Sequence, residues 1–264
     1  NAPILVRGSE FETTSPDSFA EAYYSYDLKR LIILLKHNGK NTAISISEQA
    51  DKSDVGRKGA ILNDKDWDFF YSGLEGLNRG GIGWMDTFMY KSASVQVFTE
   101  HDAVAPKSSV FLFKWLKAGW ASMNVVKRSH IYDGSLRYAR SLETVLESPT
   151  LTPNQVVEGM KPVTSMSEVE MDGLIKEYAK NFEIRFKNDP KLQKKEYAKV
   201  IADGGYAEVL DTEARKSVLA LQKLKGMLGM ETLVDLSSSP VAQAPMVDDE
   251  SVSEAAQPEV EPES

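Results

Sequence analysis

The sequence contains no cysteine, and only three of its 264 residues are histidine. The absence of cysteine excludes disulfide-stapled scaffolds, thiolate nucleophiles, and zinc or iron–sulfur sites held by cysteine. No apolar run approaches the roughly 18 residues that a membrane-spanning helix needs, so the sequence predicts no integral membrane span. Because histidine, the usual proton shuttle and metal ligand, is also scarce, we expect no catalytic residue, metal site or cofactor.

A surplus of positive charge is missing as well. The formal net charge is -8, and seven of the 39 acids lie in residues 237–264, which contain no basic residue. The rest of the chain has 32 acids against 31 bases, so it lacks the positive surplus that phosphate binding requires. We therefore expect no nucleic-acid partner.

The two ends of the chain carry their own signals. Residues 237–264 are rich in Ser, Pro, Ala and acids, and such a segment buries too little apolar surface to offset the entropy lost on ordering. The sequence therefore predicts a disordered acidic tail. Because the chain begins with Asn1-Ala2-Pro3 rather than methionine and has no cysteine, we expect an exported protein, located in the periplasm or another extracytoplasmic compartment.

The first part of the chain predicts an extended arm over residues 1–15 and then a helix. Ser15-Pro16 is typical of an N-cap followed by proline at the first helical position. Apolar side chains three or four residues apart predict an amphipathic helix over 16–37, which Asn38-Gly39 would end.

The following residues predict short elements of both kinds. Alternating apolar and polar side chains predict strands at 43–47 and 94–98. Residues 48–62 are charged and contain two glycines, which indicates a surface loop. Asn63 is a candidate N-cap for a second helix that continues to residue 77.

Beyond Pro106 the pattern is helical. The expected helices cover 107–127, 133–147 and 167–186, and others begin after Thr152, after Asp189 and at Thr212. The sequence thus predicts a mainly α, multi-helix body with a small β or irregular element in its N-terminal half. In this scheme a mixed half, 16–106, packs against a helical half, 107–236, and the acidic tail follows.

The three histidines do not predict a catalytic arrangement. His37 ends the first expected helix, where a cation interacts favourably with the helix dipole. His101 is flanked by Glu100 and Asp102, but neighbours in an extended chain point to opposite faces, which favours a polar turn over an acid–base site. His130 lies in a basic segment and is expected to be solvated.

Two further motifs match ligand-binding loops only in part. Gly80-Gly81-Ile82-Gly83 follows an expected helix, whereas phosphate loops follow a strand, so a flexible turn is favoured. Four acids match positions 1, 3, 5 and 12 of a calcium loop, but Phe69 stands where such a loop needs glycine. These acids, which we assign to an aspartate-rich helix start, are Asp64, Asp66, Asp68 and Glu75.

Aromatic side chains are concentrated in residues 67–120, which hold twelve of the 24 in the chain, including every tryptophan. Phe111 and Trp115 are four residues apart and are expected to share one helical face. If these side chains are buried they anchor the core, and if they are partly exposed they anchor a partner; the sequence leaves both open. The candidate interface residues are Trp67, Trp84, Phe111, Trp115 and Trp120.

The sequence favours a non-catalytic structural or assembly protein, a sheath- or scaffold-like subunit or accessory component of a larger complex or filament. Its expected partners are other protein subunits, either copies of itself or different chains. The alternative is a small-molecule-binding module in which tryptophans line an aromatic pocket. An enzyme, which would have to use carboxylates, tyrosines or a single histidine, is the third hypothesis.

Overall fold

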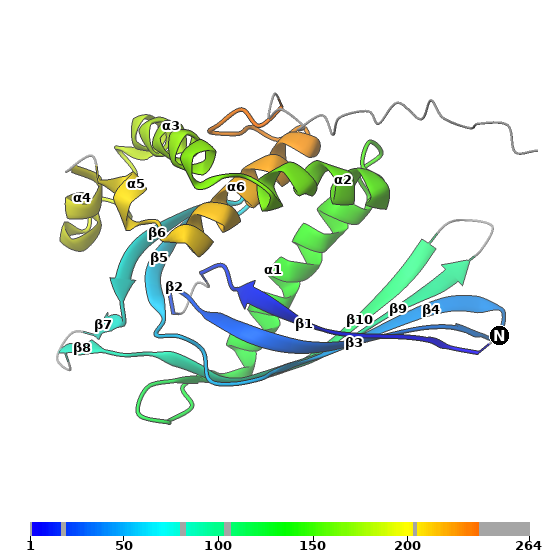
Figure 1. The fold of residues 1–264 in the computed structure, drawn as a ribbon. Coiled ribbons are helices and arrows are strands. Elements are labelled where there is room, and N and C mark those ends of the chain that lie inside the picture. The colour runs from blue at the N-terminus through cyan, green and yellow to red at the C-terminus, as the bar shows by residue number, and fades with distance from the viewer. Residues whose placement is uncertain (1, 17–19, 80–82, 103–106, 203–204, 238–264) are drawn as a thin grey trace, which may run out of the picture.

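A computed structural model of the chain describes residues 2–16, 20–79, 83–102, 107–202 and 205–237 (Figure 1). The structure is 35% helix and 37% strand. The prediction of a mainly α, helical protein is therefore wrong. Strands occupy the described chain up to residue 119, and helices follow from residue 128.

The largest element is a five-stranded antiparallel sheet with the order β1-β3-β4-β9-β10. Two of its connections are hairpins, between β3 and β4 and between β9 and β10. Of the smaller sheets, β5 to β8 lie between β4 and β9 in the chain, and β2 lies between β1 and β3. The strands are β1 (Ile4–Thr13), β3 (Ser25–His37), β4 (Lys40–Gln49), β9 (Phe88–Asp102) and β10 (Lys107–Gly119).

Two smaller sheets complete the β structure of the described residues. One has the order β2-β5-β6 and consists of β2 (Ala22–Tyr23), β5 (Arg57–Asn63) and β6 (Asp68–Glu75). The other pairs β7 (Leu77–Arg79) with β8 (Gly83–Met85).

Figure 1 shows α2 to α6 gathered in one layer near β5 and β6, while α1 runs from the five-stranded sheet up to that layer. None of the helices in the described ranges is long and apolar enough to span a membrane. The helices are α1 (Arg128–Leu146), α2 (Pro153–Thr164), α3 (Glu168–Phe186), α4 (Lys195–Ala202), α5 (Tyr206–Val209) and α6 (Thr212–Met227).

The helix predicted over 16–37 is instead β2 and β3. Along this segment Tyr24, Tyr26 and Leu28 are buried at every second position, which is the period of a strand. A spacing of four residues is compatible with both a helix and a strand, and this explains the error. Asn38 and Gly39 have φ angles of 48° and 78°, so they form a tight hairpin turn with two left-handed residues rather than a helix end.

Two other helix predictions fail for the same reason. The segment 63–77 contains the end of β5 and all of β6, and 107–119 is β10. The expected arm 1–15 contains β1, and the expected loop 48–62 contains most of β5. The strands predicted at 43–47 and 94–98 are confirmed within β4 and β9.

The helices predicted after residue 128 are largely confirmed, because their start signals are local. Thr152 accepts a hydrogen bond from the backbone N–H of Gln155, and Ser167 accepts one from that of Glu170. Asp211 caps α6 in the same way. The helix expected after Asp189 begins later than predicted, at Lys195.

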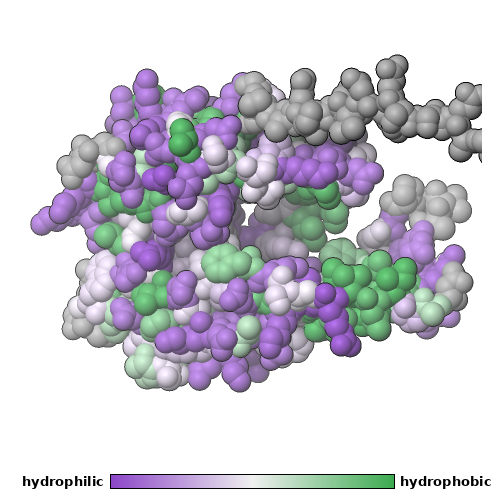
Figure 2. Space-filling model, viewed as in Figure 1, coloured by the Kyte–Doolittle hydropathy of each residue, from purple (hydrophilic) through white to green (hydrophobic). Residues whose placement is uncertain are grey.

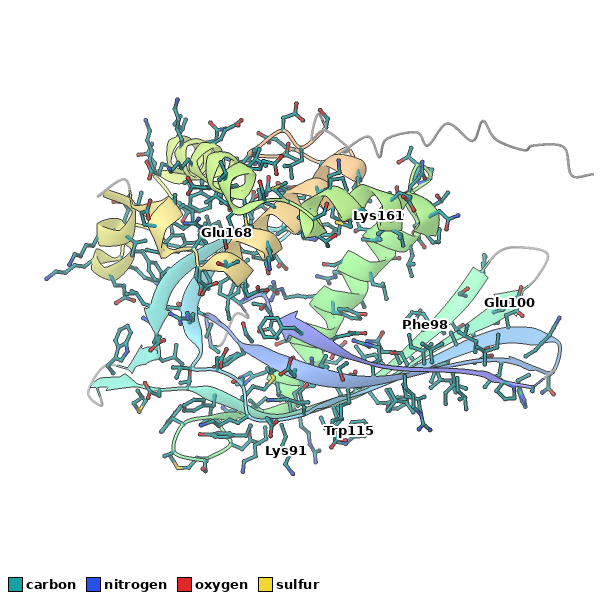
Figure 3. All side chains as sticks on the ribbon, viewed as in Figure 1. Lys91, Phe98, Glu100, Trp115, Lys161 and Glu168 are labelled. Atoms are coloured by element: carbon teal, nitrogen blue, oxygen red, sulfur yellow. The ribbon has the colours of Figure 1, made fainter. Side chains whose placement is uncertain are left out.

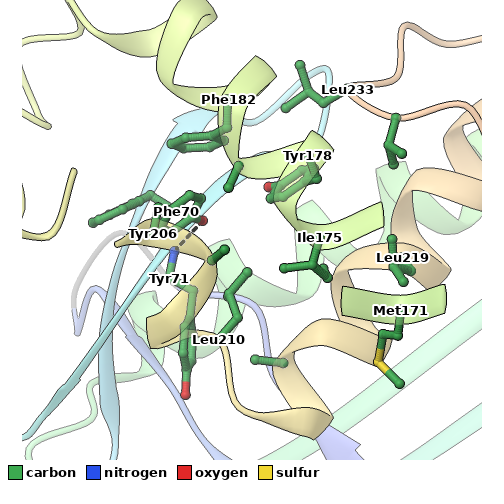
Figure 4. Close-up of a cluster of buried hydrophobic side chains, with 14 of the residues drawn as sticks. Phe70, Tyr71, Met171, Ile175, Tyr178, Phe182, Tyr206, Leu210, Leu219 and Leu233 are labelled. Atoms are coloured by element: carbon green, nitrogen blue, oxygen red, sulfur yellow. Dashed lines mark hydrogen bonds between the residues drawn. The ribbon is translucent and has the colours of Figure 1, made fainter. Parts of the chain in front are cut away.

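The main hydrophobic core lies between β5, β6 and the helical layer (Figure 4). At its centre Phe70 of β6 stacks on Phe182 of α3 and on Tyr206 of α5, with ring centroids 5.9 and 5.3 Å apart. Phe70, Tyr206 and Tyr197 are completely buried. This core attaches the helices to the small sheet, not to the five-stranded sheet.

A buried ion pair also joins α6 to β6. Nζ of Lys225 donates to Oδ1 of Asp68 over 2.7 Å, and the two side chains are 1% and 2% exposed. Arg185 lies 3.5 Å from the other carboxylate oxygen of Asp68, too far for a good hydrogen bond. Lys225 therefore depends on Asp68 to compensate its charge.

Replacing Asp68 with leucine is expected to lower the free energy of unfolding by about 3–5 kcal/mol, because Lys225 is then buried without its partner. The double variant Asp68→Leu/Lys225→Met should recover most of this loss, since neither charge is then buried. Urea unfolding measures both effects. As a control, Glu158→Ala breaks the exposed pair of Glu158 with Lys161 and should change stability by less than about 1 kcal/mol. A double variant as unstable as Asp68→Leu would contradict this account.

Candidate functional site

One face of the five-stranded sheet is covered by α1, and the other face points away from it. On β10, Leu112, Lys114 and Leu116 line a cavity beneath α1. Because successive side chains of a strand alternate, Phe111, Phe113 and Trp115 point away from α1. Figure 3 shows Trp115 on the side of the sheet opposite α1. We call the side facing α1 the inner face and the opposite side the outer face.

The outer face carries a continuous apolar surface. Strand pairing places Phe113, Val95, Ile46 and Leu31 in one row beside Arg7, and a second row joins residues of the same five strands. Arg7, at the sheet edge, is the only charged residue among the ten in these two described rows. The surface, here named the outer patch, consists of Leu5, Leu31, Ile33, Leu35, Ile44, Ile46, Ala93, Val95, Val97, Phe111, Phe113 and Trp115.

The outer patch is uncovered. Phe111, Phe113 and Trp115 are 52%, 53% and 58% exposed, and the helices that the structure describes lie on the inner side of the sheet (Figure 1). The space-filling view shows a separate group of hydrophobic residues at the end of the sheet where β1 begins (Figure 2). Exposed residues at the start of β1 include Ile4 and Val6, which alternate with Leu5 and so belong to the inner face. A monomeric protein rarely exposes so much continuous apolar surface.

The inner face beneath α1 carries several polar side chains by contrast. Ser47, Ser92, Ser94 and Gln96 all lie on this face and line the cavity. An antiparallel sheet ordinarily turns its apolar face toward the covering helix and its polar face toward water. Here the covered face is mixed, since Leu28, Leu112 and Leu116 line the same cavity as these polar residues, whereas the uncovered outer face carries the outer patch.

The four tryptophans have four different environments. Trp67 is only 8% exposed and has a positive φ of 56° in the turn between β5 and β6. Trp84 is 48% exposed on β8, where the ammonium of Lys58 lies 5.2 Å from its ring. Trp120 lines the cavity beneath α1, and Trp115 belongs to the outer patch. The structure therefore brings Trp115 and Phe111 together on one face but disperses the other candidates.

The cavity beneath α1 has a volume of about 580 Å³, within the range typical of small-molecule sites. Its roof, α1, is held by polar contacts rather than by a core, and each of its residues remains at least partly exposed. Arg137 makes a bidentate contact with Asp64, at 2.6 to 3.0 Å, and also donates to the carbonyl of Pro16. The hydroxyl of Tyr138 donates to Oε1 of Gln96 on β9 over 3.1 Å.

Ionisable groups in this cavity are coupled to one another. Nε of Arg30 donates to Glu10 over 2.7 Å, and this hydrogen bond raises the pKa of the guanidinium. The hydroxyl of Tyr26 donates to Glu12 over 2.8 Å. Burial, followed by the charge of Glu12, raises the pKa of Tyr26 above its ordinary value.

A second cavity, of about 510 Å³, lies where β6 meets α3 and α6. A third of its lining residues are aromatic, and these are tyrosine and phenylalanine with Trp67 as the one tryptophan among the described lining residues. Tyr71, on this wall, donates through its hydroxyl to Asp211 at the start of α6 over 3.2 Å. Several of these rings also belong to the main core.

No known protein family, curated protein or solved structure matches this chain.

The surroundings of the three histidines differ in part from those that the sequence predicts. His37 ends β3 and pairs with Lys40 in the hairpin, so the predicted helix dipole at His37 is absent. His101 is exposed near the end of β9, and its carbonyl oxygen accepts from Nζ of Lys40. His130 is half-buried and lines the cavity beneath α1, where its Nδ1 accepts from the backbone N–H of Lys127.

The acids of the calcium-like pattern do not converge. Asp64 pairs with Arg137, Asp68 with Lys225, and Glu75 with Arg57, while Asp66 accepts from the side chain of Asn63. They belong to a β-hairpin and not to the predicted helix start. Within the described ranges, no group of three or more His, Asp or Glu side chains is arranged to hold a metal ion.

Some predictions concern residues that the structure does not describe. The turn predicted at Gly80-Gly81-Ile82-Gly83 lies mostly outside the described residues, as does the tail beyond Ser237. The sequence analysis does not predict the polar residues on the inner face, although an alternating pattern that indicates them is present in β4 and β9. Serine or glutamine stands at every second position in Ser45-Ile46-Ser47 and again in Ser92-Ala93-Ser94-Val95-Gln96, which is typical of strands with one polar face.

Proposed function

We propose that this protein is a non-catalytic assembly subunit that joins a second copy of itself through the outer patch. The observation that carries the proposal is the outer patch, which has no cover within the described chain. Because exposing adjacent large apolar side chains to water is unfavourable, a surface of this kind is typical of an interface.

The size of the outer patch is that of a modest interface. It spans five residues on each of β9 and β10, from Ala93 to Val97 and from Phe111 to Trp115. Strands lie about 4.8 Å apart and rise about 3.3 Å per residue, so five strands of five residues cover roughly 400 Å². Two copies packed face to face would bury about 800 Å², in the range of weak or transient interfaces.

The geometry of the outer patch also suits self-association. Sheets pack face to face about 10 Å apart when both inner surfaces are apolar. A two-fold axis places the same patch on both sides of the interface, so one apolar surface is sufficient. Phe113 and Trp115 are of the residue size that commonly dominates binding energy at such interfaces.

The test is the oligomeric state of the full chain. We expect the wild type to sediment as a dimer at micromolar concentration. Trp115→Ala and Phe113→Asp should each raise the dissociation constant by about thirtyfold or more, the scale of an interface hot spot of about 2 kcal/mol. Because both side chains are more than half exposed, thermal melting of the dissociated monomers should be nearly unchanged.

Trp84→Ala provides the matched control, since Trp84 is similarly exposed but lies on β8, away from the outer patch. It should leave the dissociation constant unchanged. A wild type that stays monomeric at high concentration contradicts self-association and would assign the patch to a partner of different sequence. Equal loss of association in Trp84→Ala and Trp115→Ala would show that the outer patch is not the interface.

A further inference from the structure

A row of polar side chains crosses the inner face of the sheet, on the side opposite the outer patch. Strand pairing aligns Arg30, Ser47, Ser94 and Lys114, which come from β3, β4, β9 and β10. The hydroxyls of Ser47 and Ser94 are hydrogen-bonded to each other over 2.8 Å. All four residues line the cavity beneath α1, and we call them the inner row.

Lys114 is the unpaired cation of the inner row. The other cations lining the cavity have carboxylate partners, because Arg30 pairs with Glu10, Lys58 with Glu196 and Arg137 with Asp64. Lys114 is half-buried and has neither a hydrogen-bond nor an ion-pair partner among the described residues. Its ammonium therefore adds positive charge to the cavity without a direct carboxylate contact among the described residues.

Among the described contacts, the acids of the cavity wall bind other partners than Lys114. Glu12 accepts from the hydroxyl of Tyr26, and Glu21 pairs with Lys194. A partly desolvated ammonium favours a nearby anion, and the serine hydroxyls beside Lys114 can donate to that anion as well.

Apolar side chains adjoin the inner row. On β10, Leu112 and Leu116 flank Lys114 on the same face. Further toward β8, a small cluster contains Leu28, Met89 and Ala118, which also line the cavity. The cavity thus joins one cationic position to an apolar wall.

The roof of the cavity leaves room for a ligand. Gly134 lies within α1, where glycine is unfavourable for a helix, and it lines the cavity. A Cβ added at Gly134 would find no heavy atom within 4 Å apart from its own neighbours and its own helix.

We propose that the cavity beneath α1 binds a small amphipathic anion, with its acidic group on Lys114 and Ser94 and its apolar part against Leu28, Leu116 and Met89. This site lies on the opposite side of the sheet from the outer patch, so it does not depend on the proposed self-association.

The experiment is calorimetric titration of the full chain with dodecanoate and with dodecylammonium, two probes with the same alkyl chain and opposite charge, below their micelle concentrations. We expect dodecanoate to bind one site per chain and to bind at least tenfold more tightly than dodecylammonium. Lys114→Gln should weaken dodecanoate binding at least tenfold. Lys117→Gln removes an ammonium three residues away on the outer face of the same strand and should leave binding unchanged.

A second pair of variants tests whether the probe binds in the cavity by filling its volume instead of removing its charge. Gly134→Leu places a side chain in the cavity and should abolish dodecanoate binding while maintaining or raising the melting temperature. Gly173→Leu is the matched control, because Gly173 is an exposed glycine inside α3 whose added Cβ also meets no neighbour. It should bind dodecanoate as the wild type does, and so should Trp115→Ala, which alters the outer patch.

The proposal is overturned if dodecanoate does not bind the wild type, or if Lys114→Gln or Gly134→Leu binds it as tightly as the wild type. It is equally overturned if dodecylammonium binds as well as dodecanoate, or if Trp115→Ala removes binding, since the probe would then occupy the outer patch. A stable dimer with no dodecanoate binding would reject this site and leave the proposed assembly intact.

Discussion

Raising the pH above about 11 is expected to unfold the protein cooperatively, because its buried tyrosines resist ionisation only in the folded state. Burial raises the pKa of each of these phenols above the ordinary value of about 10. In addition, the neighbouring Asp211 raises the pKa of Tyr71. The residues are Tyr26, Tyr71, Tyr178, Tyr197 and Tyr206.

The sign follows from the number of protons bound in each state. Above about pH 10 the unfolded chain loses its tyrosine protons while the folded chain retains them, so the free energy of unfolding falls as the pH rises. Each proton that only the folded chain retains lowers the free energy of unfolding by about 1.4 kcal/mol per pH unit, so five such protons lower it by roughly 7 kcal/mol per unit. A typical stability of about 5–15 kcal/mol is lost within one or two units.

Circular dichroism and phenolate absorbance, recorded together during an alkaline titration, test this expectation. The loss of secondary structure should coincide with the ionisation of several tyrosines. Tyr178→Phe keeps the ring in the core but removes one retained proton, so its stability should fall less steeply with pH. Ionisation of all the tyrosines without loss of structure would contradict the argument.

Ending the chain at Met230 is expected to lower the free energy of unfolding by about 6 kcal/mol, because this removes three buried apolar side chains of about 2 kcal/mol each. Leu233, Val234 and Leu236 are all buried against the main core. The backbone N–H of Leu233 also donates to Oε1 of the buried Gln222 over 2.7 Å, and this acceptor would lose its partner.

Ending the chain at Ser237 is the matched control. It removes only the acidic segment, whose composition predicts no contribution to a core, so stability should change by less than about 1 kcal/mol. Denaturant unfolding of the two shortened chains and the full chain measures both effects. If both truncations destabilise the protein equally, the residues beyond Ser237 contribute to the fold.

The sequence predicts the second half of the fold better than the first because the signals there are local. Thr152, Ser167 and Asp211 each form a cap within the next three residues, so their effect does not depend on distant chain. In the first half, Tyr24 and Leu28 are four residues apart, a spacing that suits one face of a helix and one face of a strand equally. Only the pairing of Leu28 with Gln49 and Glu10 selects the strand.

The same ambiguity between helix and strand affects the candidate interface residues, but here it does not change which residues share a face. Phe111 and Trp115 were placed on one face because of a helical spacing, and they do share a face, although on a strand. Their role at an interface stays a prediction, as do the roles of Trp67, Trp84 and Trp120. The inner row could not be predicted, because Arg30, Ser47, Ser94 and Lys114 are brought together only by the strand order β3-β4-β9-β10.

The sequence by itself determined what depends on composition and near neighbours: the absence of cysteine chemistry, the near-neutral body, the helix starts after residue 128 and the aromatic content of residues 67–120. Only the tertiary structure decided that the strands β1 to β10 pair into sheets, that the outer patch of the largest sheet is uncovered and that a cavity with polar and apolar walls lies beneath α1. The physical reason is that strand pairing and the choice of the covered face depend on contacts between residues far apart in the chain, which local spacing does not encode.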